Sequence, residues 1–451
     1  MSSFYVENFG CRATQADGAA IERQLQERGY TLALAPQHAE LVVLNTCTVT
    51  ANADHDVRAA IRRIHRQNPT CRILVTGCYA QRAPQEIAAI EGVSAVIGNS
   101  HKTQLAQIAC GDTALAGGEL PGASCEPNTP VAGQGDVDIY VGDIFAHTEL
   151  TGAPVFETGA KTRPNLKVQD GCNNRCSFCI IPAVRGRSRS LELGEAIREV
   201  QGLVEAGYRE VVISGINLGR WGRDLAGRQR FEDLVRTILE RTALEKLRIS
   251  SVEPMDWSEE LIALVANSSR VAKHAHVPMQ SGSDRVLRQM HRKYRPWHYA
   301  DRLHRIRAAM PTAAIGADLM VGFPGETAED FEATRLMVEQ LPFTYLHVFT
   351  YSARPGTPAA QMPQPVTPPV IKERNRILRE LAAQKKLRFM QSFLGQEITA
   401  ITLNEYADGC TEALTDNYLQ LQIPGHLAPN QWVTARVESV SAEGMRGEVR
   451  I

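Results

Sequence analysis

Two regions of the chain alternate short apolar runs with amphipathic segments, a pattern typical of parallel α/β folds. In the first region, up to about residue 110, it predicts strands at residues 4–6, 41–44, 73–75 and 93–97. In the second, it predicts strands at residues 166–168, 210–214, 247–251, 274–277, 314–321 and 345–349. Amphipathic helices between the strands include residues 19–28, 57–67 and 194–206. Because parallel strands need crossover helices, we expect an α/β protein with an N-terminal parallel domain and a central partial (β/α)6 barrel.

The remaining stretches have other patterns. Residues 111–159 are rich in Gly, Pro and Ala and are predicted to be a linker, with one short strand within residues 136–145. The proline-rich segment 355–369 predicts a rigid connector that is not helical, followed by a long basic helix at 371–393. Beyond it, apolar residues alternate with period two, which predicts a small all-β barrel of about five strands. The expected domains are therefore residues 1–110, the linker 111–159, residues 160–390 and residues 391–451.

Composition narrows the classes of protein to be considered. The net charge of −1 does not indicate a nucleic-acid-binding protein, but Lys and Arg cluster at residues 284–307 and 371–393. Such clusters are either phosphate contacts or solvated helix faces. The chain has no apolar run of about 18 residues and no secretory leader, so we expect a cytoplasmic protein without a membrane span. In that compartment its 10 cysteines are more often metal ligands or free thiols than disulfides.

The first candidate site is a tight group of three cysteines, Cys172, Cys176 and Cys179, in a Gly- and Asn-rich segment. Three thiolates at this spacing suit three corners of an iron–sulfur cube, whose fourth iron stays open to a non-protein ligand. A zinc site usually has a fourth Cys or His nearby, and buried structural cysteines are rarely spaced so closely. The spacing therefore favours a cluster with an open iron.

The second candidate site depends on position rather than spacing. Cys11, Cys47 and Cys78 each follow a predicted strand of the N-terminal domain. The carboxyl ends of parallel strands lie at one edge of a sheet, so the three thiols are expected to converge into a second cluster site. The alternative is that each is a small buried apolar residue. The other cysteines lie outside both groups and are interpreted as free thiols: Cys71, Cys110, Cys125 and Cys410.

The run K-V-Q-D-G-C-N-N-R-C-S-F-C from residue 167, with the I-I-P-A-V-R-G that follows it, resembles the methylthiotransferase branch of the radical S-adenosylmethionine superfamily. The resemblance implies two [4Fe-4S] clusters. The first cluster would be bound by Cys172, Cys176 and Cys179. S-adenosylmethionine at its open iron would be cleaved to a 5′-deoxyadenosyl radical. The auxiliary cluster would lie on Cys11, Cys47 and Cys78.

The resemblance also implies S-adenosylmethionine contacts at the strand ends of the barrel. The candidate residues are Gly215, Asn217, Glu253, Gln280, Asp318 and Gly322. The alternative interpretation of such residues is that they are turn glycines or helix caps.

The motifs around the N-terminal cysteines are similar to those of one subfamily. N-T-C-T-V-T at residues 45–50 and V-T-G-C-Y-A-Q at 75–81 resemble the enzymes that act on N6-threonylcarbamoyladenosine at position 37 of tRNA. One S-adenosylmethionine would methylate a sulfur on the auxiliary cluster, and a second would yield the radical that takes hydrogen from carbon 2. The family usually has an Asn shortly after the first cysteine, whereas this chain has R-A-T-Q at residues 12–15.

The implied partners are a tRNA anticodon stem-loop and an external electron donor of the flavodoxin or ferredoxin type. G-C-T-E-A-L-T-D-N-Y at residues 409–418 resembles the C-terminal TRAM domain of the family, an RNA-binding β-barrel. Three alternatives remain: a methylthiotransferase for isopentenyladenosine at position 37, one for a ribosomal protein aspartate, and a non-catalytic RNA-binding iron–sulfur protein.

Overall fold

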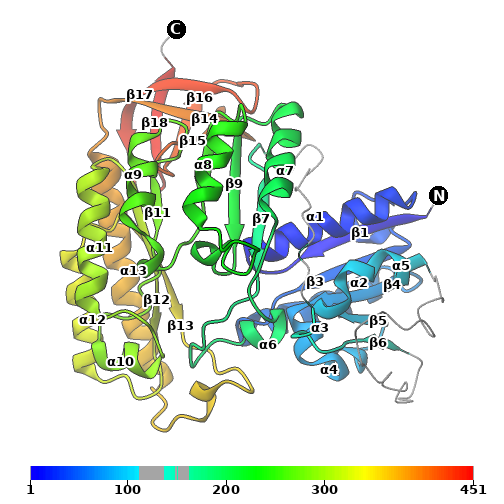
Figure 1. Cartoon of the computed structure of the whole chain (residues 1–451). Helices are drawn as coiled ribbons and strands as arrows, with labels where there is room; N and C mark the ends of the chain where they lie inside the picture. The colour runs from blue at the N-terminus through cyan, green and yellow to red at the C-terminus, as the bar shows by residue number, and fades with distance from the viewer. Residues whose placement is uncertain (1, 111–136, 148–149, 151–161, 450–451) are drawn as a thin grey trace.

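The computed structural model describes residues 2–110, 137–147, 150 and 162–449. An N-terminal α/β domain lies beside a central partial barrel, and a small β-barrel covers one end of the latter (Figure 1). The predicted α/β architecture with its three parts is confirmed. The domain boundaries themselves stay predictions.

The N-terminal domain is built on six parallel strands in the order β2-β1-β3-β4-β5-β6. They span Ser3–Asn8 (β1), Thr31–Leu32 (β2), Leu41–Thr46 (β3), Arg72–Gly77 (β4), Val93–Gly98 (β5) and Asp138–Tyr140 (β6). Every residue of β3 is buried, since helices cover both faces of the sheet. The short strand β6 lies within the predicted linker and pairs with β5 as an edge strand.

The helices of this domain are α1 (Arg12–Glu27), α2 (Ala51–Gln67), α3 (Cys78–Arg82), α4 (Pro84–Ala88) and α5 (Leu105–Cys110), with 3-10 turns η1 (Pro36–His38) and η2 (Asn99–Gln104). The prediction for the first helix was wrong at its start: α1 begins directly after Cys11 rather than at residue 19. Its first turns bury the small residues Ala13, Thr14 and Ala16, which give only a weak hydrophobic pattern.

The central domain contains six parallel barrel strands, as predicted. They are β7 (Asn165–Asp170), β9 (Glu210–Gly215), β10 (Lys246–Ile249), β11 (His274–His276), β12 (Ala314–Val321) and β13 (Tyr345–Thr350). Parallel bridges Leu247–Val271 and Ser251–His276 join the half containing β7, β9 and β10 to the half containing β11, β12 and β13. The short strand β8 (Arg189–Ser190) pairs antiparallel with β7.

Amphipathic helices cover the outside of this barrel. They are α7 (Leu193–Glu205), α8 (Phe231–Arg241), α9 (Glu259–Asn267), α10 (Asp284–Gln289), α11 (Pro296–Ala309) and α12 (Ala328–Gln340), with the 3-10 turns η4 (Leu218–Arg220) and η5 (Pro254–Asp256). The short helix α6 (Ile181–Arg185) packs instead against α3 of the N-terminal domain. One continuous apolar core fills the space between these helices and the strands.

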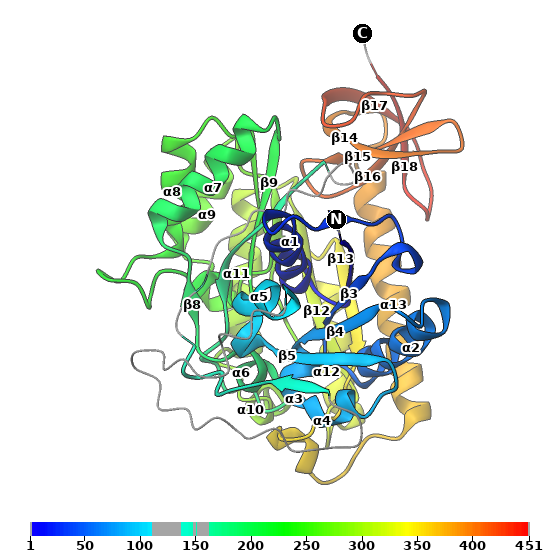
Figure 2. The ribbon, with the colours of Figure 1, turned by 90° about the vertical axis from the view of Figure 1, so that its right-hand side faces the viewer.

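The long helix α13 (Pro368–Gln391) crosses the outside of β13 and leads to the C-terminal barrel (Figure 2). It begins within the segment predicted to be non-helical, which also contains a 3-10 turn, η6 (Pro358–Gln361). That prediction was wrong at its end because Pro368 and Pro369 occupy the first turn of the helix, where no backbone N–H is needed. Among the described residues, no helix is both long and apolar enough to cross a membrane.

The C-terminal domain is a closed barrel of β14 (Glu397–Ala407), β15 (Cys410–Thr415), β16 (Gln420–Pro424), β18 (Met445–Val449) and β17 (Trp432–Val440). Buried Arg248 donates hydrogen bonds to the carbonyls of Thr415 and Asp416, and Asn417 donates to the carbonyl of Thr312. Because Thr312 comes just before β12, the small barrel covers the amino ends of the central strands. The carboxyl ends lie on the opposite side, near α6.

Candidate functional site

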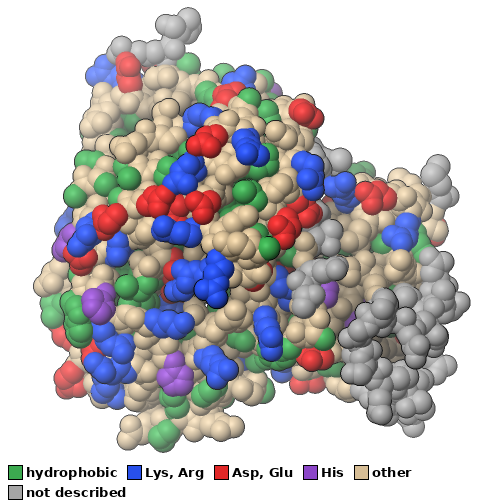
Figure 3. Space-filling view, viewed as in Figure 1, with side chains coloured by type: hydrophobic (Ala, Val, Ile, Leu, Met, Phe, Trp, Pro, Cys, Tyr) green, Lys and Arg blue, Asp and Glu red, His purple; other side chains and the backbone are tan. Residues whose placement is uncertain are grey.

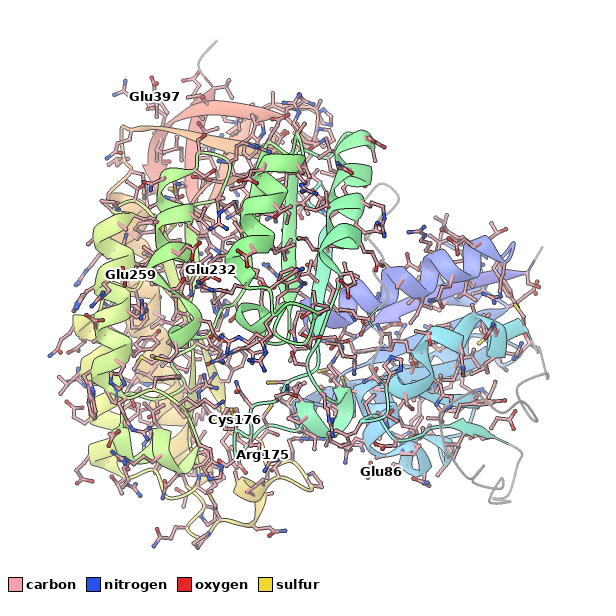
Figure 4. All side chains as sticks on the ribbon, in the orientation of Figure 1. Glu86, Arg175, Cys176, Glu232, Glu259 and Glu397 are labelled. Carbon is pink, nitrogen blue, oxygen red and sulfur yellow. The ribbon has the colours of Figure 1, made fainter. Side chains whose placement is uncertain are left out.

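Cys172, Cys176 and Cys179 lie in one compact loop at the carboxyl end of β7. Cys172 N–H donates to the Gly186 carbonyl at 3.1 Å, and Cys179 N–H donates to the Cys176 carbonyl at 3.1 Å. Gly171 has φ +68° and faces the Arg187 carbonyl so closely that a Cβ would lie 1.9 Å from its oxygen. The close return of the chain therefore requires glycine. Figure 4 shows Cys176 far from Glu397 and near the N-terminal domain.

Hydrogen-bond donors surround the three sulfurs. The Asn174 backbone N–H and the Asn217 side-chain amide donate to Cys172 Sγ at 3.4 and 3.5 Å. The Arg292 guanidinium donates to Cys176 Sγ at 3.3 Å. N–H groups and a buried cation stabilise negative charge on sulfur. The surroundings therefore suit an anionic iron–sulfur cluster on three thiolates.

Burial opposes ionisation of the free thiols. It raises the pKa of Cys172, and it raises the pKa of Cys179 to about 12 against the opposing effect of the Ile181 backbone N–H. Without a metal these thiols are protonated at neutral pH. Cluster assembly must therefore displace protons from the site.

The predicted S-adenosylmethionine contacts on the β9 side lie beside this loop. A Cβ on Gly215 would lie 2.9 Å from Gln169 Cβ, so glycine lets the end of β9 pack on β7. The Asn217 backbone N–H donates to Gln169 Oε1 at 2.7 Å, which fixes the backbone from which the side-chain amide reaches Cys172. Asn217 Oδ1 is buried and has no hydrogen-bond partner among the described residues. A buried acceptor of this kind suits an amino group of a ligand.

Glu253 forms an ion pair with Arg292, whose guanidinium also contacts Cys176. Arg292 is 7% exposed, so it is not a surface cation. Sequence reasoning placed it in a basic cluster and missed this role, because the spacing of charges along the chain does not tell which of them turns inward. Arg292 thus connects the first thiol group to Glu253.

The other predicted contacts lie further along the strands. The backbone of Gln280 has φ +64°, and its N–H donates to the Asp318 carbonyl at 2.8 Å. Gly322 has φ +78°, and a Cβ there would lie 2.6 Å from Ile371 Cγ1, so glycine permits α13 to pack. Contacts of Gln280, Asp318 and Gly322 with S-adenosylmethionine stay predictions.

Cys11, Cys47 and Cys78 meet at the carboxyl edge of the N-terminal sheet, as expected from their strand-end positions. Cys11 precedes α1, Cys47 follows β3, and Cys78 begins α3 directly after β4. A Cβ on Gly10 would lie 2.8 Å from Cys47 Sγ, which shows how closely the Cys11 loop approaches Cys47. Burial, together with the neighbouring Cys78 and Cys11, raises the pKa of Cys47 to about 12.

Helix α6 lies between the two thiol groups. Cys78 packs with Ile180 and Val184 in one apolar cluster, and Ile180 directly follows Cys179. The Asn99 amide donates to the Val184 carbonyl at 2.7 Å and to Cys78 Sγ at 3.7 Å. Figure 2 also shows α3 and α6 as neighbours. Cys78 of the second group is therefore in contact with the segment that directly follows Cys179 of the first group.

A buried charge network holds the two domains together at this point. Asp17 accepts hydrogen bonds from Lys102 at 2.9 Å, from Arg185 at 3.0 Å and from Lys167. Asp170 accepts from Arg185 at 3.0 Å and from Lys167 at 2.9 Å. Burial acts to raise the pKa of each carboxyl, but the surrounding cations hold both well below the usual range. The cavity beside this network contains none of the six candidate cysteines.

Many Lys and Arg side chains of the two predicted basic clusters form ion pairs or hydrogen bonds with other residues of the chain. Arg285 pairs with Asp330, Arg305 with Glu259, Arg374 with Glu326, and Arg376 with Glu373 and Glu380. Arg307 and Lys385 donate to backbone carbonyls. These contacts favour the interpretation of much of the two clusters as structural rather than as phosphate sites.

Comparison with known proteins identifies the family. Residues 3–98 match the family described as Uncharacterized protein family UPF0004, and residues 166–338 match the Radical SAM superfamily. The Threonylcarbamoyladenosine tRNA methylthiotransferase MtaB of Bacillus subtilis is 36% identical over 430 residues, covering 94% of this chain and 91% of that protein. The protein of the same name from Aquifex aeolicus is 33% identical, covering 93% of this chain and 96% of that protein. The chain belongs to the radical S-adenosylmethionine methylthiotransferases.

This methylthiotransferase also matches relatives with another named product and solved structures with the same fold. The tRNA-2-methylthio-N(6)-dimethylallyladenosine synthase of Saccharopolyspora erythraea is 35% identical, covering 88% of this chain and 77% of that protein. The structure of the radical S-adenosylmethionine methyltransferase TsrM from Kitasatospora setae has a TM-score of 0.56 at 18% identity, covering 79% of this chain and 75% of that chain. The predicted enzyme class is thus confirmed, and the structural likeness concerns the fold alone.

Proposed function

We propose that this methylthiotransferase replaces the hydrogen on carbon 2 of N6-threonylcarbamoyladenosine, at position 37 of tRNA beside the anticodon, with a methylthio group. The observation that carries the proposal is the meeting of two three-cysteine groups on either side of α6. The names of the relatives from Bacillus subtilis and Aquifex aeolicus support the choice of nucleoside.

Cys172, Cys176 and Cys179 would hold one [4Fe-4S] cluster with S-adenosylmethionine at its open iron, and Cys11, Cys47 and Cys78 would hold the second. When bound, these groups supply the radical that removes the hydrogen and the sulfur that replaces it, since an aryl C–H bond is too inert for acid–base catalysis. The donors found at the sulfurs and the unpartnered Asn217 Oδ1 fit this assignment.

The protein's own residues orient and shield the reactants. Asn217 is fixed by Gln169 so that its amide points at Cys172 and its oxygen is free to accept from the amino group of S-adenosylmethionine. Phe178 and Met320 pack against the apolar cluster that contains Val286 and Phe323, and these side chains shield one side of the cysteine loop from water. Exclusion of water protects a radical from side reactions.

The tRNA would approach from the end of the barrel that carries the cysteines. Exposed Arg175 lies directly beside Cys176 at that end (Figure 4). On the face shown in Figure 3, Lys and Arg side chains gather toward the same end, while acidic side chains lie among them toward the opposite end. The TRAM-like barrel covers the amino ends of the strands, so it would contact a part of the tRNA away from the anticodon loop.

An external donor must reduce the first cluster, and we propose a flavodoxin- or ferredoxin-type protein. The exposure of the cysteine loop, in which Asn173 and Arg175 reach solvent, gives such a donor access to this end. A cytoplasmic location would supply both the donor and the tRNA.

Removal of the Asn217 amide is expected to lower the reduction potential of the first cluster. Hydrogen bonds to cluster sulfurs stabilise the reduced, more negative state, so the Asn217→Ala variant should have a more negative midpoint with unchanged iron content. A redox titration monitored by electron paramagnetic resonance measures the midpoint potential. Asn174→Ala is the matched control, because it keeps the backbone N–H that contacts Cys172. Equal midpoints for Asn217→Ala and wild type would contradict the role of the amide.

Deletion of the gene is expected to remove the 2-methylthio form of threonylcarbamoyladenosine from tRNA, with accumulation of the unmethylthiolated nucleoside. Mass spectrometry of tRNA nucleosides tests this, and complementation with the intact gene should restore the product. Loss of methylthio-isopentenyladenosine instead would establish the alternative substrate. An unchanged nucleoside profile together with loss of a ribosomal protein modification would reject the tRNA assignment.

A further inference from the structure

Three side chains on the inner face of the barrel form a cluster away from the cysteines. His276 on β11, Asp318 on β12 and His347 on β13 each offer one ligand atom, and these atoms lie within 4.8 Å of one another. The register explains the meeting, since Asp318 is paired directly with His347, and His276 is paired with Gly316, two residues before Asp318. Residues two apart on a strand share a face, so the three side chains point to the same side of the sheet.

Two of the three separations match those between ligands of one metal ion. His276 Nε2 and His347 Nδ1 each lie 3.3 Å from Asp318 Oδ1. Ligands at about 2.1 Å from a divalent transition metal lie roughly 3.0–3.5 Å from each other in octahedral or tetrahedral geometry. Imidazole nitrogens and a carboxylate are ordinary ligands for such ions. Asp318 Oδ1 is therefore spaced from both imidazole nitrogens as ligands of one ion would be, and the third separation stays within 4.8 Å.

The buried nitrogen of the cluster lies at ion-pair distance from the carboxylate but is not aligned for a good hydrogen bond. His276 is 8% exposed, and its Nε2 has no hydrogen-bond partner in the described part of the chain, although it faces the Asp318 carboxylate. Buried polar atoms are nearly always partnered. A metal ion between the three residues would satisfy this nitrogen.

Neighbouring residues hold the cluster in place. The Tyr345 ring lies over Gly316, where a Cβ would come within 1.9 Å of Tyr345 Cζ. Tyr345 hydroxyl and His274 Nε2 are 2.6 Å apart, and the Tyr345 ring is tilted against the His347 ring. These contacts restrict the ring of His347, which is otherwise 54% exposed. The site is thus supported on one side and accessible on the other.

We propose that His276, Asp318 and His347 bind a divalent transition-metal ion through two imidazoles and one carboxylate. With three protein ligands, the ion keeps coordination positions open toward the inside of the barrel. The proposal assigns Asp318 to this ion rather than to S-adenosylmethionine. It does not depend on the nucleoside that the enzyme modifies, and it shares no ligand with the cysteine groups.

Titration with Mn²⁺ alone tests the site in the RNA-free, anaerobically reconstituted full-length enzyme. Mn²⁺ suits the experiment because it prefers nitrogen and oxygen ligands to thiolates, and the electron paramagnetic resonance signal of the free ion reports what remains unbound. Wild type is expected to bind one equivalent. His347→Ala and Asp318→Asn are each expected to raise the Kd by at least about tenfold, with iron content and circular dichroism unchanged.

His304→Ala is the matched control, because it removes an exposed imidazole on α11 and should bind Mn²⁺ as wild type does. An anomalous difference peak between the three residues in Mn²⁺-soaked crystals is expected as well. The proposal is overturned if wild type binds no Mn²⁺, or if His347→Ala and Asp318→Asn bind it with the wild-type Kd.

Discussion

The Cys78→Ala variant is expected to cleave S-adenosylmethionine but to transfer no methylthio group. Cys78 lies in the N-terminal group of thiols, across α6 from the loop that would generate the radical. Loss of one of three ligands should remove the auxiliary cluster, so iron falls from about eight to about four atoms per chain. The assay is the amount of 5′-deoxyadenosine and of methylthiolated nucleoside formed from the same reaction mixture.

Two further variants make the result specific. Cys176→Ala should lose both 5′-deoxyadenosine and methylthiolated product, because Cys176 belongs to the loop beside Asn217 and Arg292. Cys110→Ala should behave as wild type, since this exposed thiol lies outside both groups. If Cys78→Ala still formed the methylthio product, the assignment of the N-terminal thiols to a second cluster would be wrong.

The Arg185→Met variant is expected to lower the free energy of unfolding by about 3–5 kcal/mol, because removal of one partner leaves buried carboxylates with too few cations. Arg185 contacts both Asp17 and Asp170, and all three are nearly inaccessible to solvent. Urea unfolding followed by circular dichroism measures the change. Exposed Arg187→Met, two residues away, is the matched control and should change the free energy by less than about 0.5 kcal/mol.

The same network predicts how stability depends on pH. The pKa values of Asp17 and Asp170 are lowered in the folded protein relative to the ordinary value of 3.8. Their contribution is therefore complete above that value and is lost as the pH falls from there through the lowered folded-state values. In Arg185→Met the carboxyl pKa values should rise, so acid unfolding should begin at a higher pH than in wild type. Identical acid-unfolding curves for Arg185→Met and wild type would show that Lys102 and Lys167 alone hold the two carboxyl pKa values low.

The sequence predicted the two cysteine groups of the site by different kinds of evidence. Cys172, Cys176 and Cys179 are close because a short loop keeps them together, so their spacing alone indicated a common ligand. Cys11, Cys47 and Cys78 were grouped only through the prediction that each ends a parallel strand, and the sheet places them together as expected. The period-two pattern likewise indicated the C-terminal barrel of about five strands, which the structure contains.

Local patterns thus determined the element types, the sheet class and both thiol groups, because strand periodicity and loop spacing act over a few residues. Tertiary structure alone decided that Arg292 turns inward to Cys176, that Arg185 joins two domains through Asp17 and Asp170, and that α6 separates the cysteine groups. It alone brought together His276, Asp318 and His347, which three different strands contribute. Such contacts depend on strand order and on which charges are excluded from water, and neither property is encoded in any short stretch of the chain.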